Sequence, residues 1–284
     1  MNNRNFIKTL IVGVLAFMAG TPAFSQSSNS MTDLEKLNRV EINTTEGSFT
    51  VALYDDTPVH RDNFLKLARE GFYDGIAFHR VIKDFMIQAG NPSTRPNATA
   101  DDVERGEELV AEIVYPQHFH KRGALAAART GDQVNPERRS SPSQFYIVTG
   151  RTFSPEQLTQ LEHKNQQGKM QQIFNGLAQQ YKDSIMSMRK ARNVEGLQRL
   201  QDELAAKTRA EAEAHPFAFT PEQREAYTTV GGSPHLDDAY TVYGEVVSGM
   251  DVVEKIEKTP TGPGDKPIDD IRILSMKVIP PGKK

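Results

Sequence analysis

The chain has 284 residues, of which 37% are hydrophobic and 25% are charged, and it contains no cysteine. This composition suits a soluble enzyme or binding module with one large domain or two ordinary ones. A formal net charge of −3 lacks the basic excess expected of a nucleic-acid-binding protein, and the absence of cysteine excludes disulfide bonds and thiol chemistry.

The first 25 residues differ from the rest of the chain. A basic start is followed by an uninterrupted apolar run from Leu10 to Gly20 and by the small residues Ala23 and Ser25. These are the parts of a secretory signal peptide, so we predict that residues 1–25 are removed by cleavage after Ser25. The protein is then exported, and it is periplasmic if the source is a Gram-negative bacterium. The apolar run is shorter than the roughly 20 residues of a membrane span, which disfavours a membrane anchor.

A linker, a hairpin and a helix are expected next. Residues 26–37 are rich in serine and asparagine over 27–30 and are predicted to form a flexible linker. Apolar and polar residues alternate over 40–53 on both sides of a Glu46-Gly47 turn, which predicts a β-hairpin with one buried face. The Thr57-Pro58 pair, a helix N-cap followed by proline at the first helical position, predicts a helix that ends at Gly71.

The remaining elements are mostly short strands. Many short strands with only two small helices predict a closed antiparallel β-barrel, capped by the helices, in one domain over residues 38–280. The expected strands are 76–82, 85–89, 123–128, 144–149, 240–246 and 271–279, and the second short helix is 249–258.

Residues 154–228 depart from this pattern. Apolar residues recur at helical spacing from Met170 to Met188 and again from Leu197 to Leu204, with a bend at 193–196. We therefore predict a helical hairpin that is inserted between two strands of the barrel. Its apolar stripe packs against its own partner helix or binds a partner protein, and a third alternative is that the insertion shields one end of a groove.

The segment Phe78–Gly90 holds the most chemical information. Arg80 and Gln88 alternate there with apolar residues, which indicates that they share a face with Phe and Met side chains. An arginine beside apolar walls offers five fixed donors to a carboxylate, a phosphate or an amide. The alternative is an arginine that pairs with an acidic residue at the rim of the barrel.

Four segments in this order resemble the cyclophilins. They are FHRVIKDFMIQAG (78–90), GALAAARTG (123–131), SPSQFYIVTG (141–150) and VYGEVVSGMDVVEKI (242–256). The resemblance covers essentially all of residues 38–280 outside the helical insertion. It implies an eight-stranded barrel, a groove that binds a proline-containing segment, and peptidyl-prolyl cis-trans isomerase activity.

The resemblance also implies roles for individual residues. Arg80 matches the catalytic arginine, and Gln88 assists it by holding the substrate carbonyl or the guanidinium. Tyr146, His235 and Tyr240 depart from the residues usual in the family, which puts tight binding of cyclosporin-like ligands in doubt. The substrate-binding positions are Phe85, Met86, Ala128, Arg129, Gln144, Tyr146, His235, Leu236 and Tyr240, with Ala128 and Arg129 acting through their main chain.

These assignments suggest a mechanism. Rotation about an Xaa–Pro bond breaks amide resonance and has a barrier of roughly 18–20 kcal/mol. In the twisted state the proline nitrogen gains a lone pair, so a guanidinium aimed at it binds this state better than either planar isomer. The reaction needs no cofactor, metal or nucleophile, and none is predicted. His118 and His120 are accordingly predicted to be structural or surface residues and not metal ligands.

The predicted partners are proline-containing segments of unfolded or flexible exported proteins. Their uncatalysed isomerisation takes roughly tens to hundreds of seconds. The alternative is a binding module or holdase chaperone, which would recognise proline peptides with little turnover and contact its clients through the helical insertion.

Overall fold

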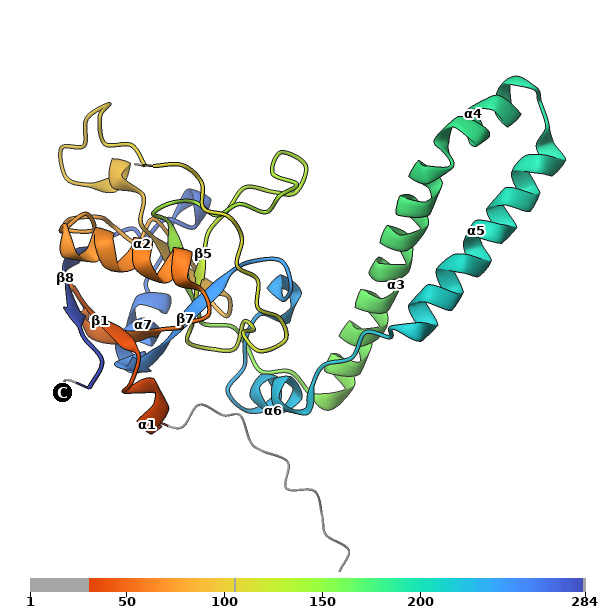
Figure 1. Ribbon diagram of the computed structural model, residues 1–284. Coiled ribbons are helices and arrows are strands. Elements are labelled where there is room, and N and C mark those ends of the chain that lie inside the picture. The colour runs from red at the N-terminus through yellow and green to blue at the C-terminus, as the bar shows by residue number, and fades with distance from the viewer. Residues whose placement is uncertain (1–30, 105, 283–284) are drawn as a thin grey trace, which may run out of the picture.

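Residues 31–104 and 106–282 are described by the computed structural model (Figure 1). The predicted signal peptide, residues 1–25, and the first part of the predicted linker lie outside these residues. The described part of the linker contains a one-turn helix, α1 (Met31–Leu34), and the first strand begins at Asn38.

Eight strands form one antiparallel sheet. Their order across the sheet is β3-β4-β6-β5-β7-β2-β1-β8, so the hairpin predicted at 40–53 forms the β1–β2 pair. The strands are β1 (Asn38–Thr44), β2 (Gly47–Leu53), β3 (Arg80–Ile82), β4 (Met86–Ala89), β5 (Ala124–Ala127), β6 (Phe145–Val148), β7 (Val242–Ser248) and β8 (Ile273–Ile279).

The prediction of a closed barrel is wrong, because the sheet is a half-barrel: its edge strands, β3 and β8, do not pair with each other. The expected strand 76–82 shortens to the three residues of β3, and the residues before it meet the chain before β8 in a single bridge between Ala77 and Arg272. One edge of β3 pairs with β4, and the short 3₁₀ helix η3 (Pro263–Asp265) also contacts β3. Arg80 therefore stands on an open edge of the sheet.

The two faces of the sheet have different partners. Side chains alternate along a strand, so Ile87 on β4 and Ile147 on β6 point into the main core, while Met86 and Tyr146 point to the opposite face. Two helices cover the main core. α2 (Pro58–Arg69) contacts β8 and β7, and α7 (Met250–Glu257) contacts β2, β4 and β3. Met86 and Tyr146 belong to a separate apolar cluster on the other face.

The start of α2 is capped by a residue that its sequence does not indicate. Thr57 occupies the N-cap position, as predicted, but its side chain makes no capping hydrogen bond. Glu112 instead accepts hydrogen bonds from the backbone N–H groups of Val59 and His60, both at 3.0 Å. A carboxylate at this end of a helix also interacts favourably with the helix dipole.

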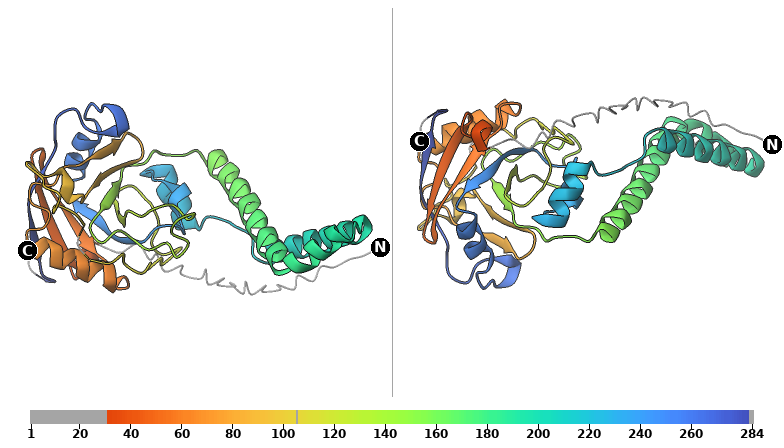
Figure 2. Two further views of the ribbon diagram at one scale, coloured as in Figure 1. Left: turned by 90° about the horizontal axis from the view of Figure 1, so that it is seen from above. Right: turned by 90° about the horizontal axis from the view of Figure 1, so that it is seen from below.

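Four helices lie between β6 and β7, in the region predicted as a helical insertion. They are α3 (Pro155–Gln180), α4 (Lys182–Lys190), α5 (Val194–Ala214) and α6 (Pro221–Thr229). α3 and α5 run side by side as an arm that projects away from the sheet (Figures 1 and 2). Ser154 and Thr220 begin α3 and α6 with complete capping boxes.

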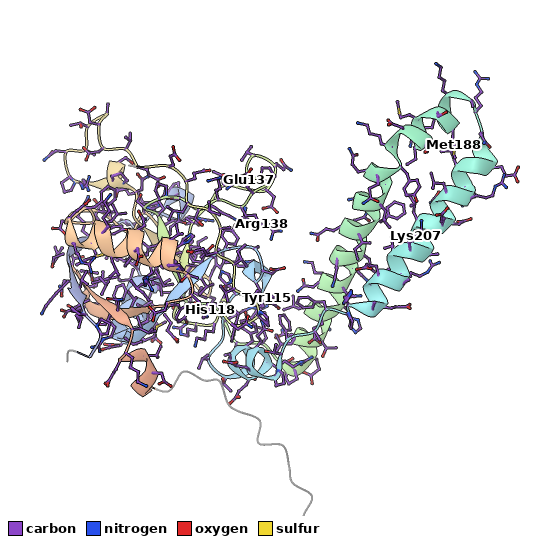
Figure 3. The ribbon with its side chains drawn as sticks, viewed as in Figure 1. Tyr115, His118, Glu137, Arg138, Met188 and Lys207 are labelled. Atoms are coloured by element: carbon purple, nitrogen blue, oxygen red, sulfur yellow. The ribbon has the colours of Figure 1, made fainter. Side chains whose placement is uncertain are left out.

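The apolar stripe of the arm is used within the arm. Leu200 and Leu204 on α5 are buried, and α5 contacts both α3 and α4. The ammonium group of Lys207 on α5 (Figure 3) lies 3.1 Å from the hydroxyl of Tyr181, which follows α3. Packing between the two helices thus accounts for the stripe. The arm projects outward from the body (Figure 2), which counts against the alternative that it shields one end of a groove.

The two ends of the insertion meet at the sheet. Gly150 at its start and Gly232 at its end approach so closely that a Cβ on Gly150 would lie 2.2 Å from the Gly232 carbonyl. Adding a long segment between adjacent points costs little loop-closure entropy, so the sheet tolerates the insertion. A small apolar cluster, which includes Leu158 of α3 and Tyr227 of α6, attaches the base of the arm to Phe119 of the body. Within the described residues, no helix is both long and apolar enough to cross a bilayer.

Candidate active site

The candidate site lies on the face of the sheet opposite the main core. Strand register pairs Arg80 with Gln88, Gln88 with Tyr146, and Tyr146 with Ala126. Directly opposed residues of neighbouring strands project to the same face of a sheet. These four residues therefore form one row across β3, β4, β6 and β5, and the polar groups stand beside the apolar side chain of Met86.

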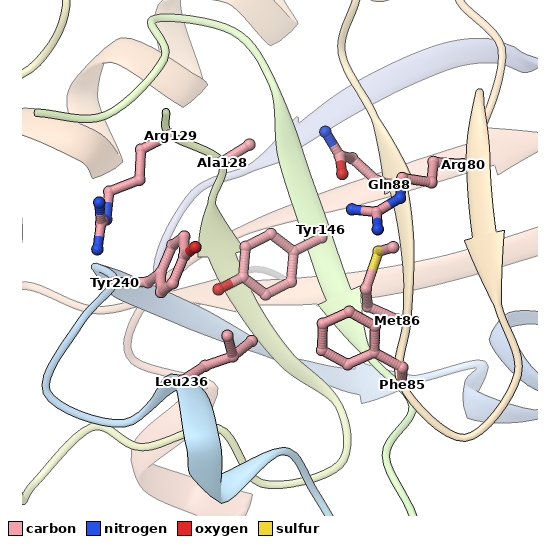
Figure 4. Close-up of a pocket in the computed structure, with 9 residues that line it drawn as sticks. All are labelled: Arg80, Phe85, Met86, Gln88, Ala128, Arg129, Tyr146, Leu236 and Tyr240. Carbon is pink, nitrogen blue, oxygen red and sulfur yellow. The ribbon is translucent and has the colours of Figure 1, made fainter. Parts of the chain in front are cut away.

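A cavity of about 170 Å³ opens over this row. Tyr146 lies in the middle, with Arg80, Phe85 and Met86 to one side and Leu236 and Tyr240 to the other (Figure 4). Nine of the eleven residues predicted from the resemblance line it, and these are Arg80, Phe85, Met86, Gln88, Ala128, Arg129, Tyr146, Leu236 and Tyr240.

Gln144 and His235 do not line this cavity. The Gln144 side chain accepts a hydrogen bond from Gln88 at 3.1 Å and donates one to Glu104. It therefore fixes the position of the Gln88 amide group. The His235 ring packs against Phe85, with the ring centroids 5.2 Å apart, and stands at the rim. The position of each side chain could not be predicted from neighbouring residues in the sequence, because it depends on contacts with a distant segment.

The guanidinium of Arg80 faces the cavity and also meets an acidic residue. Its Nε lies 3.4 Å from Oδ2 of Asp265 on η3, and the two side chains are 45% and 47% exposed. A solvent-exposed pair of this kind contributes about 0–1 kcal/mol. Asp265 is a surface acid whose one hydrogen bond with Arg80 uses the inner nitrogen Nε, so the terminal Nη1 and Nη2 groups are not hydrogen-bonded to it.

The structure limits the main-chain groups of Ala128 that can bind a substrate, and it shows where the Arg129 side chain lies. The N–H of Ala128 donates to the Gln144 carbonyl oxygen, and the Ala128 carbonyl oxygen accepts from Ser141. Only the second lone pair of that carbonyl is left for a substrate. The Arg129 side chain is turned from the cavity, donates to the Ala239 carbonyl oxygen at 2.8 Å and lies 4.4 Å over the Tyr240 ring.

A buried hydrogen-bonded chain runs behind the cavity. The Tyr146 hydroxyl lies 2.9 Å from His120 Nε2, and His120 Nδ1 lies 3.1 Å from Oδ1 of Asp237. The other oxygen of Asp237 accepts from the Tyr227 hydroxyl of α6 at 2.6 Å. Burial, with smaller contributions from Tyr240 and Asp237, raises the pKa of Tyr146 well above its usual value. We refer to Tyr146, His120, Asp237 and Tyr227 as the buried chain.

The sequence analysis identified only Tyr146 of the buried chain as a residue of the site. The one available signal was Tyr146 at a position usually held by phenylalanine, because a buried hydroxyl needs a hydrogen-bonding partner. Asp237 and Tyr227 had no such signal. The buried chain links the floor of the cavity to the inserted helix α6.

The pattern of matches to known proteins decides the family. Residues 39–195 and 205–278 match the family model described as cyclophilin type peptidyl-prolyl cis-trans isomerase/CLD. The chain belongs to this family. It is therefore an enzyme of the isomerase class, as the resemblance of the four sequence segments implied.

Relatives of this isomerase share much of its length. A putative peptidyl-prolyl cis-trans isomerase of Staphylococcus saprophyticus subsp. saprophyticus is 28% identical over 259 residues, which cover 88% of this chain and 100% of that protein. One of Staphylococcus aureus (strain USA300) is 29% identical over 241 residues, covering 84% and 91%. The crystal structure of a cyclophilin type isomerase of Cryptosporidium parvum is 20% identical, with a TM-score of 0.50, and covers 85% of this chain and 97% of that one. That structure supports the likeness of fold alone.

The histidines considered as metal ligands have separate partners in this isomerase. His118 Nε2 lies 2.7 Å from Asp56, and its ring stacks on Tyr54 with centroids 3.9 Å apart. His120 belongs to the buried chain. In the parts of the chain that the structure describes, no three histidine, cysteine or acidic side chains are grouped so that they could hold one metal ion.

Replacing Tyr146 with phenylalanine is expected to lower the free energy of unfolding by about 1–3 kcal/mol, because buried His120 loses its partner. The ring that lines the cavity remains, so kcat/KM for a proline peptide should change less than about threefold. Urea unfolding and a peptide isomerisation assay measure the two effects. Tyr240→Phe is the matched control, and a large loss of activity in Tyr146→Phe alone would give the hydroxyl a role in the reaction.

Proposed function

We propose that this isomerase accelerates rotation about Xaa–Pro bonds in exported proteins, and that Arg80 stabilises the twisted imide. One observation carries the mechanism: the guanidinium of Arg80 lines the same cavity as Phe85 and Met86. A proline ring in contact with the two apolar side chains would have its nitrogen within reach of the arginine. The planar imide accepts a hydrogen bond at nitrogen poorly, so the interaction strengthens only as the bond twists.

The surroundings of Arg80 support this assignment. Its strand partner Gln88 is fixed by a hydrogen bond to Gln144, so the Gln88 amide group is oriented beside Arg80. Donors that are already in place when charge develops lower a barrier without a cost of reorganisation. Met86 is 2% exposed, so one wall of the site excludes water and strengthens the electrostatic interaction.

A tetrapeptide assay tests the activity. The purified chain is expected to accelerate cis-to-trans conversion of a proline tetrapeptide well above the spontaneous rate. A matched tetrapeptide without proline serves as the blank for the coupled readout. A chain that binds the peptide in an equilibrium titration but leaves its rate unchanged would favour the binding-module alternative over the isomerase.

The proposal that the substrates are exported proteins rests on residues 1–25. Their basic start, short apolar run and small residues have the arrangement of a signal peptide. Expression of the full chain in a Gram-negative bacterium, followed by fractionation, tests the proposal. Recovery of a processed form in the periplasm is expected, and an unprocessed cytoplasmic protein would refute it.

The arm formed by α3, α4 and α5 is proposed to contact unfolded clients. It projects from the body, and Met186 and Val194 near its far end are 58% and 75% exposed. The base must be kept in any deletion, because α6 and the start of α3 pack on the body. Replacing residues 171–207 with a short glycine linker is expected to weaken suppression of client aggregation and to leave tetrapeptide turnover unchanged. Unchanged suppression would exclude the arm from chaperone activity.

A further inference from the structure

A second cavity, of about 250 Å³, lies where the base of the arm meets the body. Leu161, Lys164 and Asn165 of α3 form one side, and Pro234 and His235 of the 3₁₀ helix η2 (Pro234–Leu236) form the other. The α3 side is contributed by the inserted helices, outside the four segments that resemble the cyclophilins. This cavity is therefore built from the insertion and the body together.

The second cavity lies next to the first, on the other side of His235. His235 lines it and also packs on Phe85, which lines the cavity assigned to the proline, while the next residue, Leu236, lines that cavity as well. A peptide that leaves the proline cavity over the Phe85 ring would pass next to His235. An extended chain advances about 3.3 Å per residue, so a residue only a few positions from the proline can enter.

The lining of the second cavity has a definite chemistry. Leu161 and Pro234 supply apolar surface, Asn165 an amide and Lys164 a positive charge. Within residues 31–104 and 106–282, no carboxylate lies within 4.0 Å of the Lys164 ammonium group. Burial, with a smaller contribution from His120 and against an opposing effect of Asp237, lowers the pKa of His235, so Lys164 is the lining residue that carries a positive charge at neutral pH.

We propose that this cavity is an additional substrate subsite, which binds an acidic residue near the proline of the same peptide. The methylene groups of a glutamate fit against Leu161 and Pro234 while its carboxylate meets Lys164 and Asn165. The proposal rests on the proposed function, because it requires the proline to occupy the first cavity. The insertion then gives the isomerase a preference for certain sequences around the proline.

Proline peptides with a single glutamate test the subsite. The glutamate is placed two to five residues before or after the proline, and each peptide is compared with its glutamine counterpart by kcat/KM. At one or two neighbouring positions, on one side of the proline, the glutamate peptide is expected to react about three- to fivefold faster, as a partly exposed charge pair allows. Raising the ionic strength should reduce the preference.

Two variants connect the preference to the cavity. Lys164→Gln is expected to abolish it, while the matched variant Lys182→Gln, which removes the same charge from the exposed helix α4, is expected to keep it. Both variants should turn over an uncharged tetrapeptide at the wild-type rate. Lys164→Glu should reverse the preference towards a peptide with lysine at the same position.

Two results would overturn the subsite. These are equal rates for glutamate and glutamine at every position, and a preference that survives Lys164→Gln. Failure of the proposed function is a separate result, since it would appear as no turnover of the uncharged tetrapeptide by the wild type. In that event, equilibrium binding of the same glutamate and glutamine peptides, measured by fluorescence anisotropy, still decides whether the cavity recognises the carboxylate.

Discussion

Replacing Arg80 with alanine is expected to lower kcat/KM for a proline tetrapeptide by about 10²-fold or more. Removal of one preorganised donor that stabilises charge in a transition state costs about 10²–10³ in rate. The loss should be mainly in kcat, because the guanidinium interacts weakly with the planar substrate and the apolar walls that bind proline remain. Single-turnover isomerisation at several peptide concentrations separates the two constants.

Three controls keep this result interpretable. The Arg80 side chain is 45% exposed and lies on an edge strand, so Arg80→Ala should leave the thermal midpoint within about 2 °C of the wild type. Arg80→Lys retains the charge but not the planar set of donors, and an intermediate rate is expected. Asp265→Asn removes the exposed ion pair and should change the rate less than about threefold. Full activity of Arg80→Ala would refute the mechanism and leave the fold and family intact.

Arg80 is accessible to a peptide, and its backbone is fixed at the edge of the sheet. Closure of the barrel would have paired β3 with β8, but η3 lies against β3 instead. The backbone pairing of Arg80 with Gln88 sets the direction of its side chain, and the loop leaves the guanidinium partly exposed beside the cavity. Arg80 lines the cavity on the face opposite the main core, where a peptide can reach it.

Local sequence patterns were sufficient to predict that Arg80 and Gln88 lie in the row of residues that forms the floor of the site. Alternation along 78–90 predicts that Arg80 and Gln88 share a face, and the strand register places Tyr146 in the same row. Period-two alternation depends only on the backbone, so it survives any error about the neighbours of a strand. The resemblance supplied the remaining lining residues, including Leu236, which follows the insertion by only a few positions.

Contacts between distant segments could not be predicted in the same way. Glu112 caps α2 from more than 50 positions away, and Asp237 joins His120 to Tyr227 behind the cavity. Each contact depends on how separate elements pack, and no spacing within either segment encodes it. The shortening of 76–82 to β3 has the same origin, because a strand ends where its partner turns away.

Replacing Asp237 with alanine is expected to lower the free energy of unfolding by about 3–5 kcal/mol, the usual effect of removing one partner from a buried charged cluster. Its side chain is 3% exposed. It accepts hydrogen bonds from the backbone N–H of His120, from the His120 ring and from the Tyr227 hydroxyl. In the variant these buried donors lose their acceptor together, and the α6 side of the insertion loses its polar attachment to the body.

The effect of Asp237→Ala should extend to substrate binding. His120 would no longer be oriented towards Tyr146, and Leu236, the neighbour of the mutated residue, would lose its fixed position on the wall of the proline cavity. We therefore expect KM for the tetrapeptide to rise severalfold while Arg80 still supports turnover. The matched control is Asp269→Ala, an exposed aspartate, which should change the free energy of unfolding by less than about 0.5 kcal/mol. Equal urea midpoints for the two variants would show that the buried chain does not stabilise the junction between insertion and body.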